Sequence, residues 1–346
     1  MPMKRHVLVK SMPRCMSVAM AVLVITAAAW AQTAETENGY YYTVQKGDTL
    51  WGLSQRFSSA PWVWPELWQE NSQIIANPHL IYPGQKLRLT RIAGGRPPAG
   101  PAAVAKSSPE PSAEGIGFYY AMIDQVGFVR KQLLAPTATV LRPRNTGLTM
   151  MSQGDVVYLH PVPNQALAKG QLMTVYRTLY PIEDEATRGL IGTQHLITGL
   201  LEVLTVEPEY AVAQIVRSYR PILPGDKLVP YERRSPWVGI QKSVPGLDAI
   251  IFKAEEPLNV FAQFNIGFMD RGRRDGVQPG QIYSVYYRDP LDLGTPSHPR
   301  TAYAPVDCGE FLVLHVEDNT ATGLITDAVR ELRAGIGVRT PPAAVY

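Results

Sequence analysis

The sequence predicts a multidomain chain in which a small α+β unit at residues 40–90 precedes two duplicated all-β domains. Three observations lead to this prediction. Apolar residues within residues 40–90 pass from strand spacing to helical spacing and back again. A stretch rich in Pro, Ala, Gly and Ser follows at residues 91–115, which is typical of a linker. Beyond it, short β-type runs occur twice, with the second copy offset by 110 residues.

The N-terminus predicts an export signal at residues 1–31. Four basic side chains precede a run of small and apolar residues that ends in Ala29-Trp30-Ala31, a pattern typical of signal cleavage. The run is shorter than the roughly 20 residues that a membrane span needs. An uncleaved anchor is the alternative that the pattern leaves open. We therefore expect an exported protein of the periplasm or cell envelope.

The net charge and the cysteine count of the mature chain indicate which partners and cross-links to expect. Removal of residues 1–31 takes the formal net charge from +3 to −1, because that segment has four basic and no acidic side chains. Nucleic-acid binding depends on neutralising phosphates, so a nucleic-acid partner is not expected. Cys308 is the single cysteine after the signal, so no intramolecular disulfide is expected either.

The first half of the α+β unit predicts a strand and a capped helix. Tyr42-Thr43-Val44 forms an extended run, and Lys46-Gly47 follows as a turn. Asp48-Thr49 can cap a helix, since either side-chain oxygen accepts from the free N–H groups of a first turn. Leu50, Leu53 and Phe57 then recur at helical spacing.

The second half predicts another helix and a closing strand. Pro65 suits the first turn of a helix, where its missing N–H costs nothing, and Glu66 favours the positive N-terminal end. Asn77-Pro78 ends the helical pattern. Tyr82-Pro83-Gly84 forms a turn before the alternating run Lys86-Leu87-Arg88-Leu89.

This βααβ unit resembles the LysM family of glycan-binding modules. The resemblance is carried by Tyr42-Thr43-Val44, Lys46-Gly47-Asp48-Thr49-Leu50, Asn77-Pro78 and Ile81-Tyr82-Pro83-Gly84-Gln85-Lys86-Leu87. It implies a sugar groove between the first strand–helix loop and the loop before the last strand. By motif position, the implied glycan-binding residues are Gly47, Asp48, Thr49, Leu50, Asn77, Ile81, Tyr82 and Pro83.

Aromatic residues add to this expectation. Four of the five tryptophans after the signal lie in the unit, at positions 51, 62, 64 and 68. Aromatic rings suit the flat apolar faces of sugars. Trp51 lies off the Leu50–Leu53–Phe57 face and joins the predicted site, whereas a core role is favoured for Trp64 and Trp68. The linker predicts a module that is tethered to, and not packed against, the β domains.

The C-terminal part predicts two β domains, at residues 116–230 and 236–340. Runs such as Val156–Leu159, Leu172–Tyr176, Leu200–Val206, Ala211–Val216 and Lys227–Val229 are separated by Gly and Pro turns. With the offset of 110 residues, Gly170-Gln171 lies on Gly280-Gln281 and Val175-Tyr176 on Val285-Tyr286. Such a long period indicates a duplicated domain.

The two copies differ most in one loop, Arg177–Gln194 in the first and Arg288–Pro305 in the second. The charged Glu232-Arg233-Arg234 divides them. The strand entry Gly-Gln-x-x-x-Val-Tyr and the closing Pro224-Gly225-Asp226 resemble the small SH3-like barrels at the C-terminus of the flagellar assembly protein T family. This second resemblance implies an envelope location and nothing about mechanism.

No pattern predicts catalysis, a metal site or a cofactor. Cys308 and His315 lie seven positions apart in one β-type run, too far apart along a strand for a nucleophile and its base. The histidines form no His-x-His or His-Glu-x-x-His pattern. Glu66 with Glu70, and Glu183-Asp184-Glu185, read first as solvated surface. Gly335-Ile336-Gly337 lacks the third glycine of a nucleotide site and predicts a turn.

The sequence therefore predicts a non-catalytic exported protein that binds N-acetylglucosamine-containing peptidoglycan, with the β domains serving assembly or docking of envelope proteins. Two alternatives stay open: a wall-remodelling enzyme anchored by the module, and a purely structural envelope component. Peptidoglycan and chitin-type polymers offer the same N-acetyl sugar, so the sequence leaves both as ligands.

Overall fold

The computed structural model describes residues 38–58, 61–78, 80–89, 116–145, 147, 149–184, 187–288 and 304–342. The predicted signal at 1–31 and linker at 91–115 lie outside these ranges and stay predictions. Among the described residues, none of the helices has the length and apolar character needed to cross a membrane.

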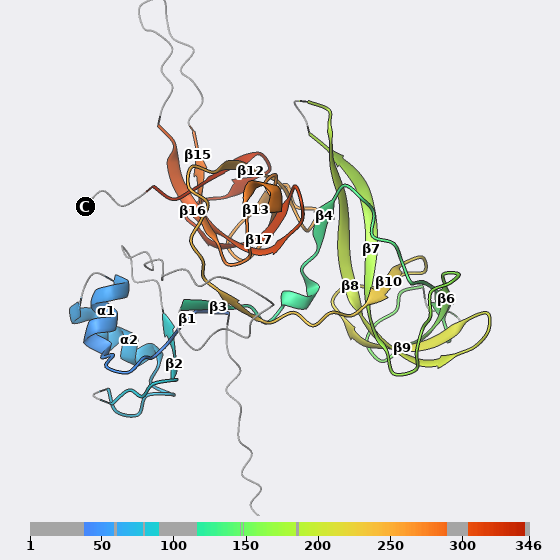
Figure 1. Cartoon of the computed structure of the whole chain (residues 1–346), viewed down its shortest axis with the longest axis horizontal. Coiled ribbons are helices and arrows are strands. Elements are labelled where there is room, and N and C mark those ends of the chain that lie inside the picture. Colours follow the sequence, from blue (N-terminus) through green and yellow to red (C-terminus); the bar gives the residue numbers. More distant parts are fainter. Residues whose placement is uncertain are drawn as a thin grey trace, which may run out of the picture. The chain divides into compact units, whose positions relative to one another are not determined.

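The N-terminal module has the predicted order of strand, helix, helix, strand (Figure 1). Its elements are β1 (Gly39–Thr43), α1 (Leu50–Ser58), the short 3-10 turn η1 (Pro61–Val63), α2 (Trp64–Glu70) and β2 (Lys86–Leu89). β1 and β2 pair antiparallel, with Tyr42 opposite Leu87. The predicted apolar face of α1 is confirmed, since Leu50, Leu53 and Phe57 are buried in one core cluster with Tyr42 and Leu87.

The sheet of the module continues into two strands from farther along the chain. β3 (Ile116–Tyr119) pairs with β1, and β11 (Trp237–Gly239) pairs with β3, giving the strand order β11-β3-β1-β2. Ile116 belongs to the core cluster of the module. The expectation of a tethered, unpacked module is therefore wrong, because the chain beyond the linker returns to hydrogen-bond with β1.

On one face of this four-stranded sheet, aromatic rings pack between the module and the two added strands. The Tyr41 ring meets the Trp237 ring edge to face, with centroids 5.2 Å apart. The Tyr119 and Trp237 centroids are 4.9 Å apart, and the Lys86 ammonium lies 3.8 Å from the Trp237 centroid. These contacts join residues of the module, the 116–119 strand and the 237–239 strand into one packed surface.

Residues 128–230 form the first β domain. Its strands are β4 (Phe128–Arg130), β5 (Ala138–Pro143), β6 (Val156–Pro161), β7 (Leu172–Glu183), β8 (Leu190–Val206), β9 (Ala211–Ser218) and β10 (Lys227–Pro230), and the turn η2 (Ile123–Gln125) precedes them. They form a sheet of order β4-β8-β7-β10-β5-β6-β9. β9 also pairs with β8, so six of the strands close a ring.

Residues 248–339 form a closed barrel. Its strands are β12 (Asp248–Ala254), β14 (Ile266–Met269), β15 (Ile282–Tyr287), β16 (Val306–Val316), β17 (Ala321–Ala328) and β19 (Ile336–Arg339). The barrel order is β12-β14-β17-β16-β15-β19. β13 (Val260–Phe261) and β18 (Leu332–Arg333) add a small two-stranded sheet, and η3 (Arg273–Asp275) a 3-10 turn.

The two rings follow one strand order. Moving along each ring from β5 or from β12, the strands run β5-β6-β9-β8-β7-β10 and β12-β14-β17-β16-β15-β19. Turn hydrogen bonds recur with the 110-residue offset: the Gly170 N–H donates to the Val203 carbonyl and the Gly280 N–H to the Val313 carbonyl. Gly170 and Gly280 have φ of 79° and 89°, the left-handed region that glycine enters without cost.

One predicted loop is in fact a pair of long strands. Residues 177–194 were expected to form a loop, but β7 continues to Glu183 and β8 begins at Leu190. Figure 1 shows these strands running on as a two-stranded arm beyond the rest of the first barrel. The hairpin turn is held by the Arg188 N–H donating to the Asp184 carbonyl. Most of the corresponding 288–305 loop lies outside the described residues.

A buried polar seam joins the first ring to the second. The carboxylate of Glu255, which is 4% exposed, accepts from the Gly127 N–H at 2.6 Å and from Arg220 at 3.1 Å. The Gln194 side-chain amide donates to the Glu255 carbonyl at 2.7 Å. The Thr322 hydroxyl donates to the Gly127 carbonyl at 3.0 Å. These hydrogen bonds and the Glu255–Arg220 ion pair join the second ring to the first ring and its flanking segment, although the Gln194 side-chain oxygen is buried without a partner among the described residues.

Candidate functional site

The loop after β1 is built around the carboxylate of Asp48. Its Oδ2 atom accepts from the Tyr42 hydroxyl at 2.7 Å and from the Gln45 N–H at 2.7 Å. Burial and the hydrogen bond to Asp48 raise the pKa of Tyr42 to about 12, so the phenol stays protonated and donating. The Asp48 carboxylate thus makes these hydrogen bonds within its own loop and stabilises the turn.

The start of α1 is capped by the next residue. The Thr49 hydroxyl accepts from the Gly52 N–H at 3.0 Å, satisfying a donor that the first turn leaves free. The sequence allowed either Asp48 or Thr49 as the cap, and the geometry assigns that bond to Thr49. Gly47 has φ of 95°, and a β-carbon there would meet no atom within 4 Å, so this turn is open on its outer side.

The two sides of the predicted site are held together by backbone hydrogen bonds. The Val44 N–H donates to the Gln85 carbonyl at 2.8 Å, and the Gly84 N–H donates to the Val44 carbonyl at 2.9 Å. The Gln85 side chain accepts from the Tyr82 N–H at 2.8 Å, which closes the second loop. The structure therefore brings the loop around Gly47 beside the loop around Pro83, as the resemblance implies.

Exposure separates the predicted site residues into two groups. Trp51 is 53% exposed and Tyr82 is 59% exposed, so both rings are available to a ligand. The Leu50 side chain is 3% exposed and belongs to the core cluster, and Ile81 packs against that cluster. Leu50 and Ile81 therefore offer a ligand mainly their backbone groups.

The remaining predicted residues lie on the surface of the module. Asn77 and Pro83 are exposed, and the Asn77 carbonyl accepts from the Leu80 N–H at 3.0 Å. Trp64 and Trp68 pack partly buried against the core, in agreement with the role favoured for them. The Trp68 indole donates to the Ile75 carbonyl at 2.9 Å. The Trp62 side chain lies outside the described part of the module.

Sequence reasoning missed two exposed apolar side chains of the module. Ile74 is 50% exposed and Leu80 is 52% exposed. Leu80 lies between Asn77-Pro78 and Ile81-Tyr82, the segments that carry the motif. Its position beside them was the available signal. Apolar groups on a loop that also presents backbone donors and acceptors suit a ligand with mixed apolar and hydroxyl faces.

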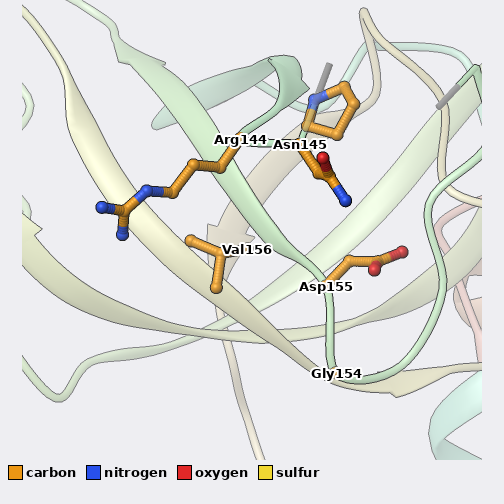
Figure 2. Close-up of a pocket in the computed structure, with 6 residues that line it drawn as sticks. Arg144, Asn145, Gly154, Asp155 and Val156 are labelled. Carbon is orange, nitrogen blue, oxygen red and sulfur yellow. The ribbon is translucent and has the colours of Figure 1, made fainter. Parts of the chain in front are cut away.

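A hollow on the first barrel has no converging polar groups. It has a volume of about 410 Å³ and is lined by residues at the end of β5 and the start of β6. Figure 2 shows the side chains of Arg144 and Asp155 directed to opposite sides. The Asp155 carboxylate also accepts from the Ser152 N–H at 2.8 Å. Binding sites need polar groups aimed at one point, and this hollow lacks that arrangement.

The residues considered for catalysis are held in structural positions. Cys308 and His315 both lie on β16, as the sequence predicted. Cys308 is 2% exposed in the core of the second barrel, and burial raises the pKa of its thiol. The His315 Nε2 atom lies 3.0 Å from a Glu317 carboxylate oxygen. Among the described residues, no group of three or more His, Cys, Asp or Glu side chains is arranged to hold a metal ion.

Comparison with known proteins identifies the class of domain that contains these loops. The model of the LysM domain family matches residues 42–90, which contain both loops and both exposed rings described above. Residues 42–90 are thus a LysM domain, and LysM domains bind peptidoglycan and chitin-type glycans. The resemblance of residues 116–340 to the flagellar assembly protein T barrels stays a prediction.

A curated relative has a similar segment. The chain is 40% identical over 57 residues to the uncharacterized protein YqbP of Bacillus subtilis (strain 168), an alignment that covers 14% of this chain. It spans 26% of that relative, so the chain matches about a quarter of the length of YqbP. The likeness is therefore local and says nothing of either whole protein.

Proposed function

We propose that this chain is an exported, non-catalytic protein of the periplasm or cell envelope that binds the N-acetylglucosamine-containing strands of peptidoglycan. The observation that supports this proposal most strongly is the arrangement of two loops in the LysM domain. Backbone hydrogen bonds between Val44, Gly84 and Gln85 fix the loops, while Trp51 and Tyr82 stay more than half exposed. Such a surface offers stacking and backbone polar groups to a sugar.

The two barrels are proposed to be a duplicated domain that serves assembly or docking. Their shared strand order and the turn hydrogen bonds that recur at the same offset support this proposal. A non-catalytic role fits the burial of Cys308, since a nucleophilic thiolate needs a lowered pKa and access to substrate, and burial raises the pKa of this thiol.

The pairing of β1 with β3 decides how the function is tested. Deleting residues 40–90 would leave β3 without its partner and expose Phe118, which is 2% exposed in the folded chain. Substitution of exposed side chains tests binding without disturbing this strand pairing. Trp51→Ala with Tyr82→Ala removes two exposed rings and leaves the core intact.

The experiment is cosedimentation of residues 32–346 with purified sacculi. We expect the wild-type chain in the pellet and the Trp51→Ala/Tyr82→Ala variant largely in the supernatant. Tyr180→Ala is the matched control, because Tyr180 is an aromatic side chain that is 89% exposed on the arm of the first barrel. Equal recovery of the double variant and the wild-type chain in the pellet would overturn the proposal.

A further inference from the structure

The outer face of the second barrel is covered by other parts of the chain. Strand pairing sets four apolar side chains in one row across β15, β16, β17 and β14: Ile282, Leu312, Leu324 and Ile266. The row packs in one core cluster with side chains of the segment before the first barrel and of β11: Phe118, Tyr120, Ile123, Val126 and Val238. This face of the second barrel is therefore an internal surface of the folded chain.

The corresponding face of the first barrel is open. At the 110-residue offset, the matching row across β7, β8, β9 and β6 consists of Leu172, Glu202, Gln214 and Val156. Leu172 is 38% exposed and Gln214 is exposed, whereas Leu324, which corresponds to Gln214, is 0% exposed. The duplicated strand order thus presents one covered face and one face that solvent reaches.

A second row of side chains extends this open face. Pairing across β8, β9, β6 and β5 aligns Thr205, Val212, Tyr158 and Arg142. The Tyr210 and Tyr158 ring centroids are 5.7 Å apart, and the Arg142 guanidinium lies 4.8 Å from the Tyr158 centroid. Residues directly opposite each other on antiparallel strands point to the same side of the sheet. The two rows and Tyr210 therefore form one continuous surface, the open face, whose tyrosines and arginine are typical of protein interfaces.

The two charges of the open face have opposite signs and lie on separate strands. Arg142 is on β5 and Glu202 is on β8, with β6 and β9 between them in the ring. Within the part of the chain that the structure describes, neither side chain forms an ion pair. A twofold interface uses the same surface on both subunits, so that surface must be complementary to itself. One positive and one negative side chain on opposite sides of the face meet this requirement.

We propose that the open face binds a second copy of this chain, the two faces packing sheet on sheet about a twofold axis that runs along the strands between β6 and β9. This axis lays β5 of each copy over β8 of the other. Arg142 of each copy then lies opposite Glu202 of the other, with the tyrosines and Val212 between the two ion pairs. The second barrel provides the precedent, since its corresponding face packs against Phe118 and Val238 of the four-stranded sheet.

The size of the open face sets the strength of the dimer. The two rows and Tyr210 amount to nine side chains, whereas a standard stable interface has about 20–30 residues on each side. We therefore expect a dimer that dissociates on dilution.

The test is sedimentation equilibrium of residues 32–346 over a range of protein concentrations. The wild-type chain should show a reversible monomer–dimer equilibrium. Arg142→Glu and Glu202→Arg should each weaken the dimer about a hundredfold, because symmetry makes each substitution remove two ion pairs, at about tenfold for each pair. The double variant Arg142→Glu/Glu202→Arg restores opposite charges at both places and should dimerise like the wild-type chain.

Two matched controls separate the open face from general surface effects. Arg188→Glu changes an exposed arginine in the hairpin turn of the same barrel, outside the open face, and should leave the dimer unchanged. Tyr210→Ala removes a ring of the open face that is 40% exposed and should weaken the dimer, whereas Tyr180→Ala removes a ring that is 89% exposed on the arm and should not.

Three results would overturn the inference. The first is a wild-type chain that stays monomeric at every concentration, which is also the result expected if the face takes a different protein. The second is a dimer that both single charge variants leave unchanged. The third is a double variant that dimerises as weakly as the single variants.

A consequence for glycan binding rests on the proposed function. A dimer carries two LysM domains, so its binding to a polymer with many sites gains from avidity. Arg142→Glu should therefore lower recovery with sacculi and leave the affinity for chitotetraose unchanged. The two proposals fail separately: a wild-type chain that does not bind chitotetraose defeats the LysM assignment, and a monomeric wild-type chain defeats the dimer.

Discussion

The two barrels share a strand order and differ in how their polar groups are satisfied. In the first, Arg177 and Asp226 neutralise each other inside the barrel, and Arg220 is bound by carboxylates from its neighbour. In the second, the corresponding positions are Tyr287, Ile336 and Arg330, and the guanidinium lies over a ring. One strand order thus accommodates an ion pair at positions 177 and 226 of the first barrel and two apolar side chains at the corresponding positions of the second.

The largest expected effect comes from Glu255, the residue of the second barrel whose carboxylate joins it to the first. Glu255→Ala removes a carboxylate that is 4% exposed and leaves Arg220 and the Gly127 N–H without it. Breaking a buried pair from one side costs about 3 kcal/mol of unfolding free energy. Arg144→Ala alters the exposed position of the first barrel that makes the corresponding backbone hydrogen bond, Arg144 to Val156 against Glu255 to Ile266, and should cost close to nothing. Urea denaturation measures both, and equal effects would contradict the assigned asymmetry.

A smaller effect is expected from the ion pair that closes the first barrel. Asp226→Ala leaves the Arg177 side chain and the Thr198 hydroxyl without their acceptor, which should cost about 2 kcal/mol. Ile336→Ala changes the corresponding residue of the second barrel, which is half-buried, and should cost about 1 kcal/mol. Denaturation midpoints of the two variants test the order, and the reverse order would break the comparison.

The pH dependence of stability should arise partly from His195 of the first barrel. Its Nε2 atom accepts from the Leu134 N–H at 3.2 Å, and its Nδ1 atom lies 3.0 Å from the Thr193 carbonyl, so the ring is held neutral. Burial lowers its pKa below the ordinary value of 6.5. The unfolded chain therefore binds the proton more readily, and stability falls as the pH drops below about 6.5.

The position corresponding to His195 in the second barrel is Pro305, so that position has no titratable side chain there. His195→Gln should reduce the loss of unfolding free energy between pH 7.5 and pH 5.5, measured by denaturation at each pH. An identical pH profile for the variant and the wild-type chain would exclude His195 as a source.

The smallest expected effect lies in the LysM domain. Thr49→Ala removes the hydroxyl that accepts from the Gly52 N–H and should cost about 1 kcal/mol. Gln45→Ala in the preceding turn leaves the Gln45 N–H bond to Asp48 in place and should cost little. Thermal melting followed by circular dichroism compares them, and equal melting temperatures would contradict the capping role.

The order of elements in the LysM domain could be predicted because it depends on local signals. Leu50, Leu53 and Phe57 lie at helical spacing, and Pro65 marks the second helix, so short-range patterns sufficed. The pairing of β1 with β3 could not be predicted this way. It joins residues separated by a linker whose composition indicates only a lack of local structure.

The candidate site shows the same division. The loops around Gly47 and Pro83 could be placed from turn residues, and backbone hydrogen bonds hold them side by side, while the sugar groove between them stays a prediction. Which side chains face outward could not be read from the motif, since Leu50 and Trp51 are neighbours yet one is 3% and the other 53% exposed.

The most direct test of the glycan assignment is calorimetric titration of residues 32–346 with chitotetraose. We expect one binding site per chain, loss of binding in the Trp51→Ala/Tyr82→Ala variant and full binding in the Tyr180→Ala control. Binding that persists unchanged in the double variant, or no binding by the wild-type chain, would contradict it.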